Sequence, residues 1–144
     1  MDLLLIQSQE HDKLPIAELN AVMETENIIA DIKPITPGLL LLRNLDEKTF
    51  NHSYKRLTDR LAYTHEVHQL IKTTNTTELE NTVLNIDWNN YINENFVVRV
   101  KRFNSDIDTV ATERNLGGLI LEKTDNVKVK LVDSKTFIRV VSYQ

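Results

Sequence analysis

Apolar residues along this chain recur at two spacings, and the switch between them predicts alternating strands and helices. Residues 3–8 form a short apolar run typical of a buried strand. Pro15 stands at a favoured first position of a helix, and apolar residues repeat every three or four positions from there until Asn27. The start of the chain therefore predicts a strand followed by a helix.

Two more apolar runs, residues 28–32 and 39–42, predict a pair of strands. The segment between them, residues 34–38, contains two prolines and a glycine. Proline cannot donate a hydrogen bond to a neighbouring strand, so we expect this segment to be a turn that belongs to neither strand.

A second helix is predicted to begin near Asp46, with an apolar stripe that runs from Phe50 to Leu61. Residues 65–71 alternate and close the series as a strand. The resulting order, strand-helix-strand-strand-helix-strand, is that of a ferredoxin-like domain.

A polar stretch without periodicity, residues 73–76, marks the predicted boundary between two domains. We place the ferredoxin-like domain in residues 1–73 and a second, α/β domain in residues 74–144. Thr77 and Glu80 have the spacing of a capping box, which predicts that a helix opens the second domain.

The second domain continues with a predicted strand over residues 96–103 and a helix that begins near residues 105–106. Residues 117–118 are two glycines inside the helical pattern. Two interpretations stay open: the glycines let the helix approach the sheet closely, or the helix ends after Asn115.

Strands at residues 127–132 and 136–141 complete the predicted second domain. The fold class predicted for the whole chain is therefore α+β.

Composition narrows the possible classes of protein. The 144-residue chain is 41% hydrophobic and 26% charged, which is typical of a globular protein and excludes a disordered one. It has no cysteine, which excludes disulfides and thiolate metal sites and leads us to expect a cytoplasmic location. No apolar span approaches the roughly 20 residues that a membrane helix needs, so no membrane partner is expected.

The formal net charge of −4 is unevenly distributed. Residues 1–73 hold eight Lys and Arg against eleven Asp and Glu, and residues 74–95 hold four acidic residues and no basic ones. Residues 96–144 hold nine basic residues against six acidic ones. A basic excess confined to one part of a chain is expected where that part meets phosphate, and its small size predicts weak, salt-sensitive binding.

Cations alternate with apolar residues in two of the predicted strands. Arg99 and Lys101 alternate with valines, so strand geometry places the apolar side chains on one face and the charges on the other. Lys128 and Lys130 repeat this pattern within residues 127–131. A solvated strand face that binds nothing has the same pattern, so alternation by itself does not establish a binding site.

Three segments, in this order, resemble the core of a THUMP domain, the RNA-binding module of several tRNA-modifying enzymes. They are Phe-Val-Val-Arg-Val-Lys-Arg-Phe (96–103), Glu-Arg-Asn-Leu-Gly-Gly-Leu-Ile-Leu-Glu (113–122) and Val-Lys-Val-Lys-Leu (127–131). Upstream, Arg-Leu-Ala-Tyr-Thr-His-Glu-Val (60–67) resembles the segment that precedes this module in archaeal-type tRNA guanine-10 N2-methyltransferases. One turn departs from that family, which commonly has Asn-Pro-Asp where this chain has Asp-Ser-Lys (133–135).

The resemblance implies a tRNA-binding module that positions tRNA for base modification. It also implies a methyltransferase domain, in cis or in trans, that uses S-adenosylmethionine. We expect basic side chains of the second domain to contact phosphates and to recognise the shape of the RNA rather than its bases. These residues are Arg99, Lys101, Arg102, Arg114, Lys123, Lys128, Lys130 and Lys135.

The sequence offers little for catalysis by the chain alone. Its three glycines cannot build the Gly-rich turn of a dinucleotide or methyl-donor site, nor a P-loop. The amino-methylating motif of the family it resembles, Asp or Asn followed by Pro-Pro-Tyr, is absent. We therefore expect no cofactor in this chain and no catalytic residue.

Other function classes remain open to different degrees. A protein-interaction module would dock a partner on its strand edges without contacting RNA. An enzyme of the acylphosphatase kind is disfavoured because no Gly-rich anion-binding loop is present. A conventional RNA-recognition motif is disfavoured because its aromatic Lys/Arg-Gly-Phe/Tyr strand signature is absent.

Two pairs of side chains allow either a purely structural or a functional interpretation. His65 and His68 are three residues apart in a predicted strand and face opposite sides, which disfavours a metal site. Trp88 and Tyr91 fit either base stacking or a small core between a helix and a strand, and we favour the core.

Overall fold

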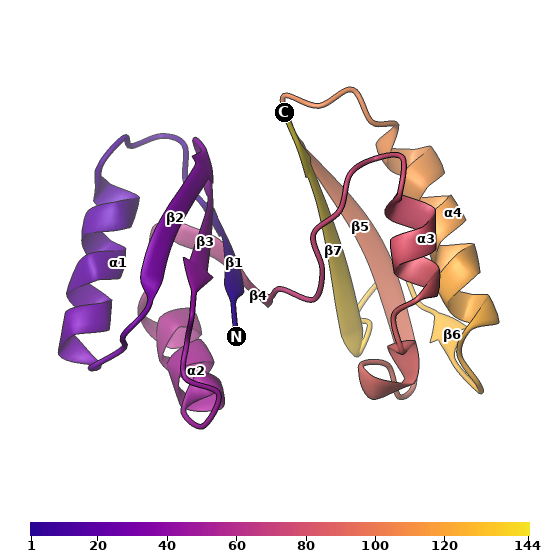
Figure 1. Cartoon of the computed structure of the whole chain (residues 1–144), viewed down its shortest axis with the longest axis horizontal. Coiled ribbons are helices and arrows are strands. Elements are labelled where there is room, and N and C mark those ends of the chain that lie inside the picture. Colours follow the sequence, from indigo (N-terminus) through magenta and orange to yellow (C-terminus); the bar gives the residue numbers. More distant parts are fainter. The chain divides into compact units, whose positions relative to one another are not determined.

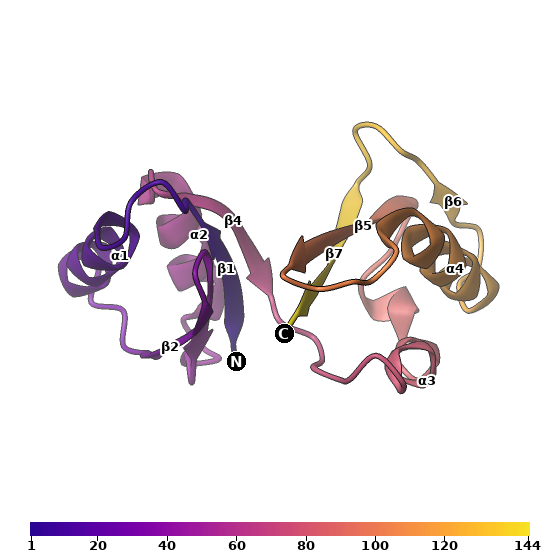
Figure 2. The same ribbon diagram turned by 90° about the horizontal axis from the view of Figure 1, so that it is seen from above.

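Strands and helices alternate along the chain in two separate units, Met1–Ile71 and Lys72–Gln144, in a computed structural model that describes all of residues 1–144 (Figure 1). The elements of the first unit are β1 (Leu3–Gln7), α1 (Leu14–Thr25), β2 (Asp31–Thr36), β3 (Leu39–Arg43), α2 (Phe50–Arg60) and β4 (Thr64–Gln69). The strands form an antiparallel sheet in the order β2-β3-β1-β4. Both helices lie on the same side of this sheet (Figure 2). The predicted ferredoxin-like arrangement is confirmed.

Leucines on the inner strands build the core of the first unit. Leu3, Leu5 and Leu42 are fully buried and pack with Leu19 of α1 and Leu57 of α2 in one hydrophobic cluster. The helical spacing of apolar residues in α1 and α2 turns one stripe of each helix toward the sheet.

The second strand lies three residues later than its apolar run predicts. β2 spans Asp31–Thr36 and includes Pro34, which the sequence pattern assigns to a turn. β2 is an edge strand, so a residue without an N–H is tolerated there, and the pairing with β3 shifts between Pro34 and Thr36. The turn is limited to Pro37 and Gly38, and Gly38 adopts a φ of 84° that favours glycine.

The second unit has a small parallel sheet. Its elements are α3 (Leu79–Leu84), a 3-10 turn η1 (Trp88–Asn90), β5 (Asn95–Phe103), α4 (Thr109–Glu122), β6 (Lys128–Val129) and β7 (Thr136–Tyr143). The strand order is β6-β5-β7, with β5 parallel to both neighbours. Helices α3 and α4 lie on one side of this sheet (Figures 1 and 2).

The sixth strand is much shorter than predicted. Only Lys128 and Val129 pair with β5, whereas the sequence pattern predicts a strand over residues 127–132. Two of the apolar side chains expected on one face of this strand are instead exposed: Val129 by 45% and Leu131 by 63%. Alternation alone therefore overestimates the length of this strand, because the chain leaves the sheet after only two residues have paired with β5.

Helix α4 begins later than predicted and does not stop at its glycines. Its N-cap is Asp108, whose Oδ1 accepts a hydrogen bond from the Ala111 N–H at 3.1 Å. The helix continues through Gly117 and Gly118 to Glu122. A Cβ at either glycine would have no neighbour within 4 Å, so the predicted close approach to the sheet is wrong.

The helix that opens the second unit forms without the predicted capping box. α3 has Glu78 at its N-cap and no side-chain hydrogen bond there. Glu80 instead accepts a hydrogen bond at 2.6 Å from the side chain of Asn115 on α4. This contact joins the two helices of the unit.

Candidate nucleic-acid interface

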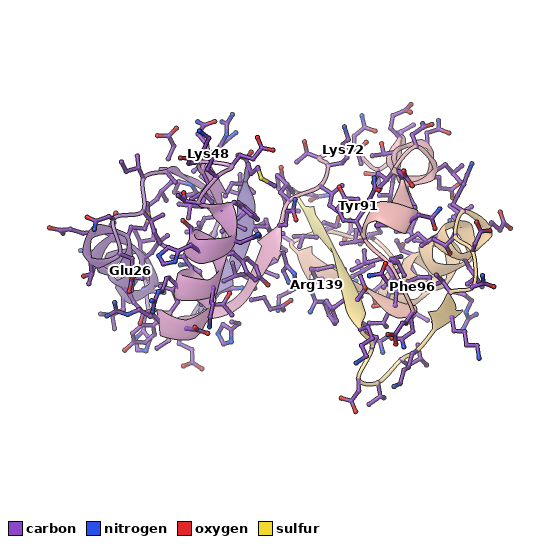
Figure 3. The ribbon with its side chains drawn as sticks, turned by 90° about the horizontal axis from the view of Figure 1, so that it is seen from below. Glu26, Lys48, Lys72, Tyr91, Phe96 and Arg139 are labelled. Carbon is purple, nitrogen blue, oxygen red and sulfur yellow. The ribbon has the colours of Figure 1, made fainter.

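Strand β5 turns a run of buried apolar side chains to one face and Arg99 and Lys101 to the other. Phe96, Val98 and Val100 are buried, and their two-residue spacing turns them toward the face that α4 covers (Figure 3 marks Phe96). Arg99 and Lys101 turn to the opposite face and are half-buried. The predicted alternation of Arg99 and Lys101 with apolar residues therefore holds, but Val97 and Phe103 are buried on the same face as the two cations.

The charged face of β5 continues onto β7 and also carries aromatic rings. Arg99 is aligned with Arg139 of β7, a cation that the sequence prediction does not assign to RNA contact. The Arg139 guanidinium carbon lies 4.8 Å from the centre of the Phe137 ring, and the Lys101 Nζ lies 5.9 Å from that of Phe103. The alternation of residues 136–141 is the signal that could have identified Arg139, whose place on β7 is marked in Figure 3.

Glu113 on α4 holds the edge of β5. Its Oε1 accepts a hydrogen bond from the backbone N–H of Val100 at 2.9 Å. Its Oε2 lies 3.6 Å from Nη1 of Arg99. The carboxylate therefore accepts a hydrogen bond from the backbone and forms an ion pair with a guanidinium at the same time.

Arg99 bends over this edge and does not extend straight into solvent. Besides Glu113, its guanidinium meets the backbone carbonyl of Leu131, to which Nη2 donates at 3.4 Å. The side chain is 39% exposed. An ion pair this exposed contributes about 0–1 kcal/mol, so the guanidinium is held weakly.

Lys128 and Lys130 lie along the same edge. β6 is hydrogen-bonded to the beginning of β5, and the Lys130 N–H donates to the Phe96 carbonyl at 2.9 Å. Both lysine side chains are exposed. Leu131, whose carbonyl accepts from Arg99, directly follows Lys130, so Arg99 lies along the same edge as Lys128 and Lys130. We call these three residues the β6 edge cations.

The remaining predicted cations are distributed around the second unit. Arg102 turns to the side of β5 opposite Arg99, and Arg114 is exposed on α4. Lys123 follows the end of α4, and Lys135 is exposed in the connection between β6 and β7. The eight predicted residues therefore do not form one continuous surface.

Lys101 and Lys135 stand at opposite ends of β5. The backbone N–H of Lys135 donates to the Asn95 side chain at 2.6 Å, where the strand begins. Lys101 follows Asn95 by six residues, which corresponds to about 20 Å along a strand. A ligand that reaches both ends must therefore extend along the whole strand.

The first unit uses its main basic cluster internally. Arg60 Nη1 lies 2.6 Å from Oε1 of Glu26, and Arg56 Nε lies 3.6 Å from Oε2 of the same carboxylate. The hydrogen bond from Arg60, together with the charges of Arg56 and Arg60, lowers the pKa of Glu26 below its ordinary value.

The two ambiguous aromatic residues differ in burial. Trp88 is buried and donates its ring N–H to the Val83 carbonyl at 2.8 Å, so it belongs to the core of the second unit. Tyr91 packs edge-on against Trp88 and is partly exposed (Figure 3).

The second ambiguous pair, His65 and His68, lies on β4 of the first unit. His68 Nε2 lies 2.7 Å from Oε1 of Glu66.

The glycines of this chain do not fit a phosphate-binding or methyl-donor loop. Gly38 lies in the two-residue turn between β2 and β3, and Gly117 and Gly118 lie inside α4. None of them joins a strand to a helix, which is where a Rossmann-type turn approaches its ligand. No helix of the chain combines the length and the apolar character required to cross a bilayer.

Comparison with known proteins extends the resemblance seen in the sequence. Residues 73–143 match the family model of the THUMP domain. The chain is 33% identical over 141 residues to a tRNA (guanine(10)-N2)-dimethyltransferase of Methanothermobacter thermautotrophicus. The match includes 98% of this chain but only 40% of that enzyme.

Two solved structures share the fold at low sequence identity. The crystal structure of PH1313 from Pyrococcus horikoshii matches 99% of this chain and 51% of its own, with a TM-score of 0.67 and 12% identity. A 4-thiouridine synthetase solved with RNA and ATP matches 97% of this chain and 38% of its own, with a TM-score of 0.63 and 14% identity. The family match and the shared fold together identify the second unit of this chain as a THUMP domain that follows a ferredoxin-like unit.

Proposed function

We propose that this chain binds tRNA and positions it for modification at a guanine N2 by an S-adenosylmethionine-dependent methyltransferase domain, in cis or in trans. The THUMP domain and the similarity to a tRNA (guanine(10)-N2)-dimethyltransferase over nearly the whole chain support this proposal. The chain spans 40% of that enzyme, so the methyl donor is assigned to the rest of such an enzyme.

The observation that carries the proposal is the line of β6 edge cations. Lys128 and Lys130 are exposed, and Arg99 lies along the same edge, held by a partly exposed ion pair and one hydrogen bond to a backbone carbonyl. Cations spaced along one strand edge can contact successive phosphates of a folded RNA without reading its bases. Lys101 extends the basic surface toward the end of β5.

Salt dependence of tRNA binding tests the proposal. Wild-type protein should bind tRNA with a log affinity that falls linearly with log salt concentration. The double variant Arg99→Ala and Lys101→Ala should bind less tightly, and the slope should shrink by roughly 0.7 to 0.9 for each phosphate that the variant no longer neutralises.

A matched control removes two cations from the first unit. Lys33 and Lys48 are exposed, and Lys33→Ala with Lys48→Ala changes the net charge as much as the double variant above. This control should keep most of the affinity and the slope. Equal losses in the two double variants, or no tRNA binding at low salt, would contradict the proposal.

A protein-interaction module is the second candidate, and one observation favours it. Leu131 and Val132 expose large apolar side chains next to Lys130, which is typical of a surface that a protein partner covers. Replacing both with serine should leave tRNA binding intact if RNA contact depends on charge. If the wild-type chain does not bind tRNA and the serine variant loses a protein complex that the wild type forms, the second candidate is favoured.

A further inference from the structure

One backbone donor of β5 is satisfied by a side chain instead of a strand. β6 pairs with β5 only at Asn95 and Phe96, so the edge of β5 beyond that point has no strand neighbour on this side. The Val100 N–H faces this open edge and donates to Glu113 at 2.9 Å. An unpaired backbone N–H at a strand edge is costly when buried and invites pairing when exposed.

The negative charge of Glu113 exceeds what this hydrogen bond requires. A neutral side-chain carbonyl could also accept the Val100 N–H, in a weaker hydrogen bond. The second carboxylate oxygen faces the Arg99 guanidinium at 3.6 Å, and it offsets part of the positive charge that would attract a phosphate. Glu113 therefore acts on the fold through one oxygen and on Arg99 through the other.

We propose that Glu113 restrains RNA binding by holding Arg99 in an intramolecular ion pair that a tRNA phosphate must displace or share. This inference rests on the proposed function, and it adds a residue that weakens the binding of RNA. The contact between Arg99 and the Leu131 carbonyl, 3.4 Å long, is the second restraint on the same side chain. A phosphate that competes with these two partners gains less than one that meets a free guanidinium, so the module releases its RNA more readily.

The test is Glu113→Gln, which keeps a carbonyl for Val100 and removes the charge beside Arg99. Binding of unmodified tRNA should become tighter by up to about fivefold, the effect of breaking one partly exposed ion pair. Protection of the Val100 amide from hydrogen exchange should be retained, which reports that the backbone hydrogen bond is intact.

Two further variants separate the local effect from net charge. Glu122→Gln removes an exposed carboxylate nine residues along α4 and should change the affinity less than twofold. In an Arg99→Ala background, Glu113→Gln should no longer bind tRNA more tightly than Glu122→Gln. Glu113 is proposed to affect RNA binding only through Arg99, so its removal has no effect once Arg99 is absent.

The outcomes distinguish this inference from the proposed function. If the wild-type chain binds tRNA and Glu113→Gln binds no better than Glu122→Gln, the restraint is refuted and the tRNA-binding function stands. If Glu113→Gln is tighter even without Arg99, the effect is general electrostatics and the inference is overturned. If no variant binds tRNA, the proposed function and the inference fall together.

Discussion

The two sheets of this protein differ in how completely they bury their apolar residues. The antiparallel sheet of the first unit places fully buried leucines on β1 and β3, with both helices over them. The parallel sheet of the second unit buries β5 well but leaves large apolar side chains exposed on β6, β7 and the connection between them. Parallel sheets are usually covered on both faces, and here both helices of the unit lie on one.

This difference indicates a division of labour. A sheet that buries its apolar side chains offers little apolar surface to a partner, whereas exposed apolar and basic side chains that lie together are typical of a surface that binds something. Leu131 and Val132 stand next to the β6 edge cations, so the binding surface we propose lies on the second unit. The first unit pairs Arg56 and Arg60 with its own Glu26.

The largest expected effect tests whether each unit depends on its own core. Phe96→Ala empties a fully buried position of the second unit and should cost about 3–5 kcal/mol of unfolding free energy. Leu42→Ala does the same in the first unit at about 2–5 kcal/mol. Hydrogen exchange should show lost protection in the mutated unit alone. Equal loss of protection in both units would show that they unfold as one.

A pair of glycine substitutions should have opposite signs in the two units. Gly38→Ala forces a side chain into a φ of 84° and places its Cβ 2.7 Å from the Gln9 side chain, so it should destabilise the protein by about 1–2 kcal/mol. Gly118→Ala meets open space inside α4 and should stabilise it by about 0.5–1 kcal/mol. Chemical denaturation measures both. A destabilising Gly118→Ala would show that the helix needs glycine there.

A substitution on the exposed apolar surface should leave stability almost unchanged. Leu131→Ser removes a side chain that is 63% exposed and should alter the unfolding free energy by less than about 0.5 kcal/mol. Thermal denaturation of the isolated chain provides the measurement. A loss as large as that of Leu42→Ala would mean that this leucine belongs to the core and that the two sheets bury their apolar residues more equally.

The smallest effect concerns the titration of Glu26. Its pKa is lowered in the folded state, chiefly by the hydrogen bond from Arg60, so this carboxylate favours folding above its unfolded pKa and loses that contribution as the pH falls through its folded value. Arg60→Ala should raise the pKa toward the ordinary glutamate value. A carboxyl NMR titration would detect the change, and an unchanged midpoint would show that Arg60 is not the main cause.

Much of the first unit could be predicted because its apolar residues are periodic. The leucine runs and the helical stripe from Phe50 to Leu61 predicted both sheet and helices in the right order. The error at β2 arose because the tolerance of Pro34 depends on β2 being an edge strand. Strand order is a property of the assembled sheet, which local pattern does not contain.

The second unit was predicted less well where residues lack neighbours. The pattern of residues 127–132 is equally compatible with a paired strand and with an exposed connection, and only two residues pair. The capping box at α3 and the close approach of Gly117 and Gly118 also failed. In each case the local motif was present, but its expected partner was elsewhere or absent.

By itself, the sequence determined that Arg99 and Lys101 lie on the face of β5 opposite Phe96, Val98 and Val100. A strand turns successive residues to opposite faces whatever surrounds it. The sequence also determined the THUMP family, through the order of three short segments. Only the tertiary structure decided what the charges meet. Glu113 and Arg99 belong to different elements, and they face each other because α4 packs on β5 with the Glu113 side chain at the open edge, where it accepts from the Val100 N–H.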